Sequence, residues 1–231
     1  MSYILNIETS GTRCSVCISH NEEIMAFREI DDGYTHAENL HLFIDDVLNL
    51  ANVQSHQISA VAVSKGPGSY TGLRIGVSAA KGLAYSLNIP LIGIDTLHII
   101  ALSAKAKNPS LAFYCPMIDA RRMEVYTAVY DNDLKLKMPV EPLIMNETSI
   151  LKFADYSNMA FFGDGMPKGQ ALLSTLKGHS FINDIQASAI VMPMISFKKF
   201  RAKQFENHAY FEPFYLKDFM ILHKKSRIQP A

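Results

Sequence analysis

The chain has 231 residues, 48% of them hydrophobic, and this length accommodates one large domain or two lobes of about 100 residues each. Its 22 Lys and Arg side chains balance 22 Asp and Glu side chains, so it lacks the basic excess with which an autonomous nucleic-acid-binding protein neutralises phosphates. No apolar run approaches the roughly 18 residues of a membrane span, and three cysteines do not suit a disulfide framework. We therefore expect a cytoplasmic protein that does not associate with membranes.

The first half of the sequence alternates predicted strands and helices in a regular order. Three short apolar stretches separated by turn residues predict a β-meander, and the next stretch predicts a helix with one apolar stripe. Strands are expected at 3–10, 13–21, 23–30, 58–64 and 90–94, and helices at 36–52, 71–87 and 96–106.

The pattern restarts after residue 110 as a looser copy of the first half. The last helix, roughly 187–206, contains Pro193, which should kink it or mark its true start. We expect two domains, an N-terminal lobe at 1–108 and a C-terminal lobe at 109–231 that includes the last helix and the tail. The elements expected before that helix are a hairpin at 111–131 around the turn "DARR", one or two strands at 135–145, a helix start at 146–154, a strand at 159–163, a glycine turn at 163–169 and a helix at 170–176.

Four glycines and one proline occur in "GPGSYTGLRIG", Gly66 to Gly76, directly after a predicted strand. A Walker loop requires Lys and then Ser or Thr after its last glycine, whereas Leu73 and Arg74 follow Gly72. A dinucleotide-binding loop requires GxGxxG after the first strand of a βαβ unit, and neither the spacing nor the position matches. The stretch is therefore either a strand-to-helix turn whose amides meet an anion or a turn that requires special backbone angles.

Four stretches together carry a family resemblance: "NIETSGTRCSV", "GPGSYTGLRIGVSAAKGLAYSLNIP", "DARRMEVY" and "PFYLKD". With these stretches the sequence resembles the bacterial TsaB family, formerly called YeaZ, over nearly its whole length. The resemblance implies an α/β fold of the actin-like, sugar-kinase-like class (ASKHA, ribonuclease H-like). Two related lobes, each a mixed sheet flanked by helices, are therefore expected, in agreement with the duplicated pattern of elements.

The resemblance also implies a function. TsaB proteins are noncatalytic dimerisation and activating subunits in the synthesis of threonylcarbamoyladenosine, the modified adenosine next to the anticodon of tRNA. The implied partners are the ligase TsaD, as a heterodimer, and the ATPase TsaE, and tRNA would be bound only through the complex. No cofactor is expected.

The sequence also indicates whether the chain could itself be the ligase. The catalytic paralogue TsaD resembles this chain around "IPLIGIDTLHIIALS", but there it carries an HxxxH pair that holds a metal. The matching positions here are Thr96 and Ile100, so the resemblance implies neither a metal site nor a catalytic residue. His98 lies alone between them, and His36 and His41 are five positions apart and point to different faces of their helix.

A nucleotide site, if the chain retains a vestige of one, would use residues from both lobes. In this superfamily an acidic residue at the end of the first strand, here Glu8 with Thr9 and Ser10, helps to position phosphate and metal. Gly163 and Gly165 of "GDGMPKG" would occupy the adenosine side of a cleft. The alternative is that Thr9 and Ser10 bond to the turn backbone and that the glycine turn has no ligand.

Two predicted helices are the candidate partner interface. The glycines and alanines of the helix after "GPGSY" would let a second helix approach closely. The alternative is that these residues belong to the internal core, and the family resemblance favours an interface with TsaD or with a second copy of the chain. Arg74 would either reach a carboxylate of the partner or cap a loop. The interface residues expected are Leu40, Ile44, Val47, Leu48, Gly72, Arg74, Gly76 and Ala80.

Two other functions are weighed against the noncatalytic subunit. An ATP-dependent small-molecule kinase of the same fold would need intact phosphate loops and a catalytic carboxylate, and ATP turnover by the isolated protein would reveal it. A metalloprotease-like activity would need the absent HxxxH pair, and a metal content assay would reveal it.

Overall fold

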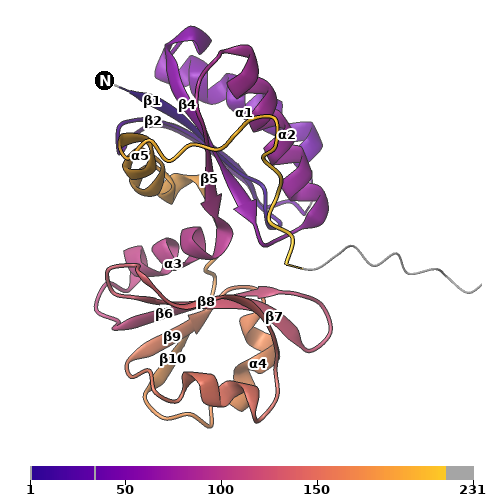
Figure 1. The fold of residues 1–231 in the computed structure, drawn as a ribbon, viewed down its shortest axis with the longest axis vertical. Helices are drawn as coiled ribbons and strands as arrows, with labels where there is room; N and C mark the ends of the chain where they lie inside the picture. Colours follow the sequence, from indigo (N-terminus) through magenta and orange to yellow (C-terminus); the bar gives the residue numbers. More distant parts are fainter. Residues whose placement is uncertain (1, 34, 217–231) are drawn as a thin grey trace, which may run out of the picture.

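The computed structural model describes residues 2–33 and 35–216 of the chain. Two five-stranded sheets form two lobes, one above the other in Figure 1, and helix α3 lies between them. Each sheet contains parallel and antiparallel strands and is flanked by helices, which confirms the predicted pair of related lobes.

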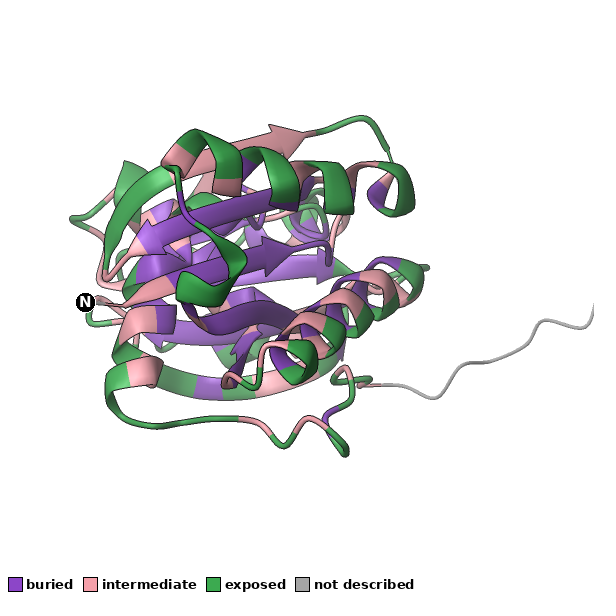
Figure 2. Ribbon diagram, turned by 90° about the horizontal axis from the view of Figure 1, so that it is seen from above, coloured by how far each residue is buried: buried purple, intermediate pink, exposed green. Residues whose placement is uncertain are grey.

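The first sheet has the strand order β3-β2-β1-β4-β5. Its central strands are rich in Ile, Val and Ala and are almost wholly buried, because helices cover both faces (Figure 2). β1 pairs antiparallel with β2 and parallel with β4. The strands are β1 (Tyr3–Glu8), β2 (Cys14–His20), β3 (Glu23–Ile30), β4 (Ile58–Gly66) and β5 (Leu91–Asp95).

The second sheet repeats the topology of the first. Its strand order, read from the opposite edge, is β8-β7-β6-β9-β10, and β6 pairs antiparallel with β7 and parallel with β9, as β1 does with β2 and β4. The duplication expected from the sequence is thus present at the level of strand order. The strands are β6 (Phe113–Asp119), β7 (Glu124–Asp131), β8 (Leu136–Ile144), β9 (Met159–Phe162) and β10 (His179–Ile182).

Helices α1 and α2 cover one face of the first sheet, where α1 contacts β2 and β3 and α2 contacts β4. Helix α5 covers the opposite face through β1 and β5. No helix of the described ranges is long and apolar enough to cross a membrane. The helices are α1 (His36–Ala51), α2 (Tyr70–Ser86), α3 (Thr96–Lys107), α4 (Met166–Leu173) and α5 (Pro193–Arg201), with 3₁₀ turns η1 (Ser55–Gln57), η2 (Ser149–Phe153) and η3 (Ala189–Val191).

Two helices connect the lobes. α3 follows β5 of the first sheet but has its most extensive contact with β6 of the second, and its apolar residues are buried on nearly all sides. α5 lies in the range 109–231 yet packs against the first sheet. Each of the two proposed ranges, 1–108 and 109–231, therefore contains one of the two sheets. One helix of each range, α3 or α5, also packs against the sheet of the other range.

The second half differs from its predicted elements in two places. α4 begins at Met166, inside the stretch expected to be a turn, because a proline is favourable in the first turn of a helix. β10 is not predicted, since its four residues form a short edge strand paired only with β9. Pro193 marks the true start of the last helix, one of the two outcomes expected for it.

The segment after α5 forms a strap along the first lobe. Glu206 forms an isolated bridge with Leu91 of β5, and Phe211 is buried in the core beneath α2. The backbone N–H of Phe214 donates to Lys65 O at 2.6 Å, where β4 ends. The strap thus partly covers the edge strand β5. The predicted tail beyond residue 216, including the end of "PFYLKD", lies outside the described residues.

Candidate partner-binding face

The glycine-rich stretch lies where the end of β1 meets the N-terminus of α2. A Cβ atom on Gly68 would lie 2.4 Å from Ser10 O, and one on Gly72 would lie 2.1 Å from Thr9 O. The backbone N–H of Ser69 donates to Ser10 O at 2.7 Å, and Thr9 Oγ1 donates to Gly72 O at 2.8 Å. The glycines are therefore required because two backbone segments of the chain are in direct contact.

The N-terminus of α2 has no open cradle for a phosphate. Ser69 caps the helix, since its Oγ accepts from Gly72 N at 3.3 Å, and the backbone of Ser10 fills the adjacent space. Gly66 has φ +112°, a value that side chains rarely allow. Of the two interpretations left open by the sequence, the geometry supports a turn with special backbone angles.

Glu8 is a carboxylate without access to solvent at the end of β1. It is 0% exposed, and its Oε1 accepts from both the N–H and the Oγ–H of Ser10 at 2.5 Å. Its Oε2 has no close hydrogen-bond partner among the described residues, and the Ser64 hydroxyl lies near enough to favour the charged carboxylate. Burial raises the pKa of the Glu8 carboxyl above its usual value, although the hydrogen bonds from Ser10 oppose the shift. A group enclosed in this way cannot contact a nucleotide or a metal in this conformation.

We expect Glu8→Gln to stabilise the protein by about 1–2 kcal/mol near pH 7, because an amide avoids the cost of a buried charge and keeps an acceptor for Ser10. A carboxyl whose pKa is higher in the folded state makes folding less favourable as pH rises from its unfolded pKa through its folded pKa. The gain should therefore vanish below about pH 4.5, where Glu8 is protonated in both states. Urea unfolding at both pH values measures it, and an equal gain at both would contradict this explanation.

Gly163 and Gly165 allow a second close approach of two backbone segments, in the other lobe. A Cβ atom on Gly163 would lie 2.3 Å from Met117 O, and one on Gly165 would lie 2.7 Å from the carbonyl carbon of Ile118. These glycines therefore support the end of β6. Gly163 and Gly165 follow β9, the counterpart of β4, and contact the end of β6, the counterpart of the strand β1 that ends at Glu8, but protein atoms fill both positions.

The positions that match the HxxxH pair of the ligase are also internal. Thr96 is 1% exposed and Ile100 is 4% exposed, both on α3 between the lobes. His98 stacks on Tyr130, with ring centroids 5.4 Å apart, and burial lowers the pKa of its imidazole. Among the residues that the structure describes, no group of three or more His, Cys, Asp and Glu side chains could hold a metal ion.

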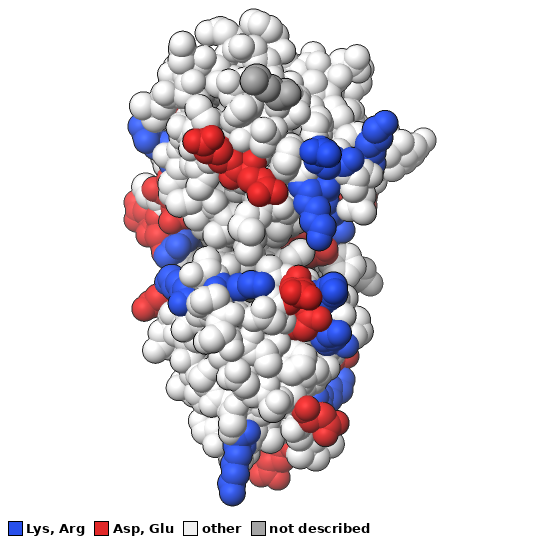
Figure 3. Space-filling view, turned by 90° about the vertical axis from the view of Figure 1, so that its left-hand side faces the viewer, with Lys and Arg blue, Asp and Glu red and all other residues white. Residues whose placement is uncertain are grey.

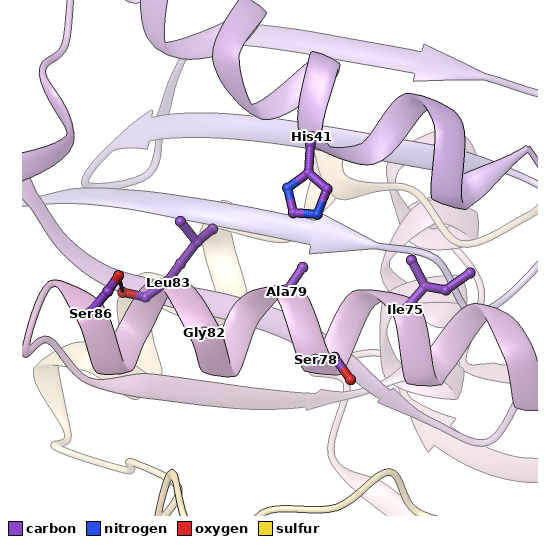
Figure 4. A pocket seen from close by; sticks show the side chains of 7 residues that line it. All are labelled: His41, Ile75, Ser78, Ala79, Gly82, Leu83 and Ser86. Atoms are coloured by element: carbon purple, nitrogen blue, oxygen red, sulfur yellow. Dashed lines mark hydrogen bonds between the residues drawn. The ribbon is translucent and has the colours of Figure 1, made fainter.

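A groove of about 420 Å³ separates α1 from α2 on the outer surface of the first lobe (Figure 4). His41 of α1 points across it toward a stripe of small and apolar side chains on α2. Gly82 on this stripe is exposed, and a Cβ atom added to it would meet nothing within 4 Å. Together with His41, the lining residues are Ile75, Ser78, Ala79, Gly82, Leu83 and Ser86.

Most residues predicted for the partner interface belong to the core of the lobe. Those that are 0–4% exposed or buried against the first sheet are Leu40, Ile44, Val47, Gly72, Gly76 and Ala80. Leu48 is partly exposed. Arg74 is exposed, and its guanidinium lies 4.4 Å from the centre of the Tyr70 ring. The two helices therefore present a different face to solvent, because most of the residues expected at the interface pack against the sheet of their own lobe.

The expected interface residues do not include the outer face of α1 and α2, although the sequence of α1 carries a second apolar set at Leu42, Phe43 and Leu50 beside its main stripe. Large hydrophobic side chains on this outer face are exposed, with Leu42 62%, Leu50 57% and Tyr85 78% exposed. Another signal was available in the sequence. Gly82 lies in the middle of a helix, where glycine costs about 1 kcal/mol relative to alanine, and no close packing within the lobe requires it.

The family model "TsaD: tRNA N6-adenosine threonylcarbamoyltransferase" matches residues 33–215. The "tRNA threonylcarbamoyladenosine biosynthesis protein TsaB" of Escherichia coli (strain K12) is 36% identical over 130 residues, which cover 56% of this chain and 55% of that protein. The chain thus spans about half the length of the curated relatives it matches.

Solved structures agree on the fold. An uncharacterized protein with similarity to peptidase YEAZ from Pseudomonas aeruginosa has a TM-score of 0.84 at 24% identity, covering 94% of this chain and 100% of that one. A ROK family protein from Streptococcus pneumoniae TIGR4, solved in complex with sucrose, has a TM-score of 0.50 at 10% identity, covering 88% and 100%. The predicted actin-like, sugar-kinase-like fold class is confirmed. Because the family model matches most of its length, the chain belongs to the family of that model and, within it, to the TsaB (YeaZ) group.

Proposed function

We propose that the chain is a noncatalytic subunit that activates the ligase of tRNA threonylcarbamoyladenosine synthesis. It pairs with TsaD through the outer face of α1 and α2, and TsaE joins this pair. The same face serves a homodimer when TsaD is absent. Two observations support this proposal. The names of the relatives indicate the pathway, and the geometry of the lobes favours a noncatalytic, partner-binding role.

The absence of a usable catalytic centre within the described lobes supports a noncatalytic role. Glu8 is enclosed and the end of β1 fills the space at the N-terminus of α2. Thr96 and Ile100 supply no metal ligands and are buried. These features disfavour both the kinase and the metalloprotease-like alternatives.

The observation that carries the proposal is the groove between α1 and α2. It is open to solvent and lined mostly by small side chains of α2, and the same two helices carry the exposed leucines Leu42 and Leu50 on α1. Small side chains let a second helix approach closely, and exposed leucines supply apolar area to bury. A helix of a partner protein is the element that fits such a surface.

The test is co-purification with TsaD of the same organism, followed by sedimentation velocity of the chain, of TsaD and of their mixture. We expect a one-to-one heterodimer that forms at the expense of any homodimer of the chain. The isolated chain should not turn over ATP. Separate sedimentation of the two proteins at micromolar concentrations would reject the subunit proposal, and ATP turnover by the chain alone would favour the kinase.

We expect the chain alone to bind tRNA weakly and with a shallow salt dependence. On the face shown in Figure 3, basic and acidic side chains are interspersed, and the formal net charge of the chain is zero. Tight binding to RNA requires several unopposed Lys and Arg side chains. Filter binding between about 50 and 200 mM salt measures the effect, and submicromolar affinity at the higher salt would contradict it.

A further inference from the structure

The connection between β6 and β7 has an unusual backbone for its sequence. Arg121 and Arg122 have φ values of +67° and +50°, in the left-handed region that Gly, Asn and Asp normally occupy. A residue with a long side chain is strained in this conformation, and such outliers are typical of functional sites. Here two adjacent arginines adopt this conformation at an exposed turn.

Neither guanidinium group has a partner among the residues that the structure describes. The other four arginines of the described ranges each have one: Arg13 and Arg28 form ion pairs, and Arg74 and Arg201 lie over aromatic rings. No ion pair, side-chain hydrogen bond or ring contact in the same ranges involves the side chain of Arg121 or Arg122, and both residues are exposed. The turn therefore presents two unpaired cationic forks to solvent.

The base of the turn is held rigidly. The carboxylate of Asp119 accepts from the N–H of Arg121 at 2.5 Å and from the ammonium of Lys168 on α4. The N–H of Asp119 in turn donates to Asp164 Oδ1 at 3.0 Å, and the close approach of Gly165 to Ile118 fixes the same corner. A side-chain pair on a fixed base loses less conformational entropy on binding than a pair on a mobile loop.

The equivalent turn of the first lobe is occupied internally. It joins β1 to β2, and its Arg13 is tied to Glu29 at 3.4 Å and to Asp31 at 3.1 Å, while Gly11 O is hydrogen-bonded to His36 Nε2 at 3.0 Å. At equivalent turns of the duplicated fold, the arginine of the first lobe is thus paired with carboxylates of the chain, whereas the two arginines of the second lobe are exposed and unpaired within the described residues. Packing of the lobe does not explain the arginines of the open turn.

We infer that the Arg121–Arg122 turn is a second docking site, separate from the groove between α1 and α2, and that it binds a carboxylate-bearing segment of a partner protein. Two planar guanidinium groups match carboxylates as forked donors. An RNA backbone fits less well, because tight binding to RNA requires a run of several unopposed basic side chains, whereas this turn offers two and the neighbouring Lys168 is paired with Asp119. Met123, 49% exposed beside the arginines, adds the apolar contact that is common at protein interfaces.

The variant that tests this inference should gain stability while it loses binding. Arg121→Asn combined with Arg122→Gly places residues that favour the left-handed region at the turn, so its melting temperature should exceed that of the parent by about 2–4 °C. Lys203→Asn is the matched control, because Lys203 is exposed, has φ +53° and also carries one positive charge. An unchanged melting temperature of the double variant would show that the turn is not strained.

Binding is measured by NMR titration of the ¹⁵N-labelled chain with a hexaglutamate peptide and, separately, with a twelve-nucleotide single-stranded RNA. We expect saturable shifts of the amides of residues 119–124 with the peptide, at least tenfold weaker binding by the Asn/Gly variant, and parental binding by Lys203→Asn. Arg121→Lys with Arg122→Lys, which keeps the charge but removes the forks, should bind with intermediate affinity.

Three results would overturn the inference: no saturable shift at 119–124, equal binding by the parent and the Asn/Gly variant, or tighter binding of the RNA than of the peptide at this turn. The measurement uses the isolated chain and needs neither TsaD nor TsaE. Its failure is therefore distinguishable from a failure of the proposed function, which is decided by the sedimentation of the chain with TsaD.

Discussion

Gly72→Ala is expected to destabilise the protein by about 3 kcal/mol or more, so that it is largely unfolded or insoluble at 37 °C. The added methyl group would lie 2.1 Å from Thr9 O and 3.1 Å from the nearest atom of the His36 ring. Neither neighbour can retreat easily, because Thr9 continues β1 in the middle of the sheet and His36 is buried at the start of α1. Overpacking against backbone is among the costliest changes of a single residue.

The matched control is Gly82→Ala, ten residues further along the same helix. A Cβ atom at Gly82 meets nothing within 4 Å, so the gain in helix propensity, about 0.5–1 kcal/mol, should appear as a small stabilisation. Thermal and urea unfolding of the two variants measure the difference in sign. Similar stabilities of Gly72→Ala and Gly82→Ala would show that β1 and α2 are further apart than the structure places them.

These two glycines also show what the sequence could and could not predict. The strand and helix order of the first lobe follows from local patterns, because its apolar runs are long and bounded by turn residues. The spacing of glycines excluded the known phosphate-binding loops. It could not reveal that Gly72 touches Thr9, because that contact joins segments 63 positions apart in the chain.

The burial of most of the expected interface residues could not be predicted for a related reason. Periodicity identifies an apolar stripe of a helix, such as that of Leu40, Ile44 and Val47, but a helix on a sheet needs this stripe for its own lobe. The face that we propose for a partner consists of the remaining residues, and on α2 these are small residues with a weak hydrophobic signal. The left-handed backbone of Arg121 was hidden as well, because "DARR" predicts a turn but not its backbone angles.

Gly82→Leu and Leu42→Asp are each expected to weaken association with TsaD by tenfold or more, which corresponds to about 1.4 kcal/mol. The leucine at position 82 would fill the groove between α1 and α2 from a site that tolerates it sterically, so the variant should remain folded. The aspartate at position 42 would place a charge on apolar surface that a partner helix has to desolvate. Isothermal titration calorimetry with purified TsaD measures both affinities.

Leu151→Asp is the matched control for Leu42→Asp, because the two leucines are 61% and 62% exposed, and Leu151 lies in η2 of the other lobe. It makes the same chemical change and should bind TsaD as the parent does. Circular dichroism and sedimentation of each variant alone distinguish lost binding from lost folding or a disturbed homodimer. If folded Gly82→Leu and Leu42→Asp both bind with parental affinity, the groove is not the docking face. Weakening by Leu151→Asp alone would instead place the interface on the second lobe, because only there would an exposed leucine be covered by the partner.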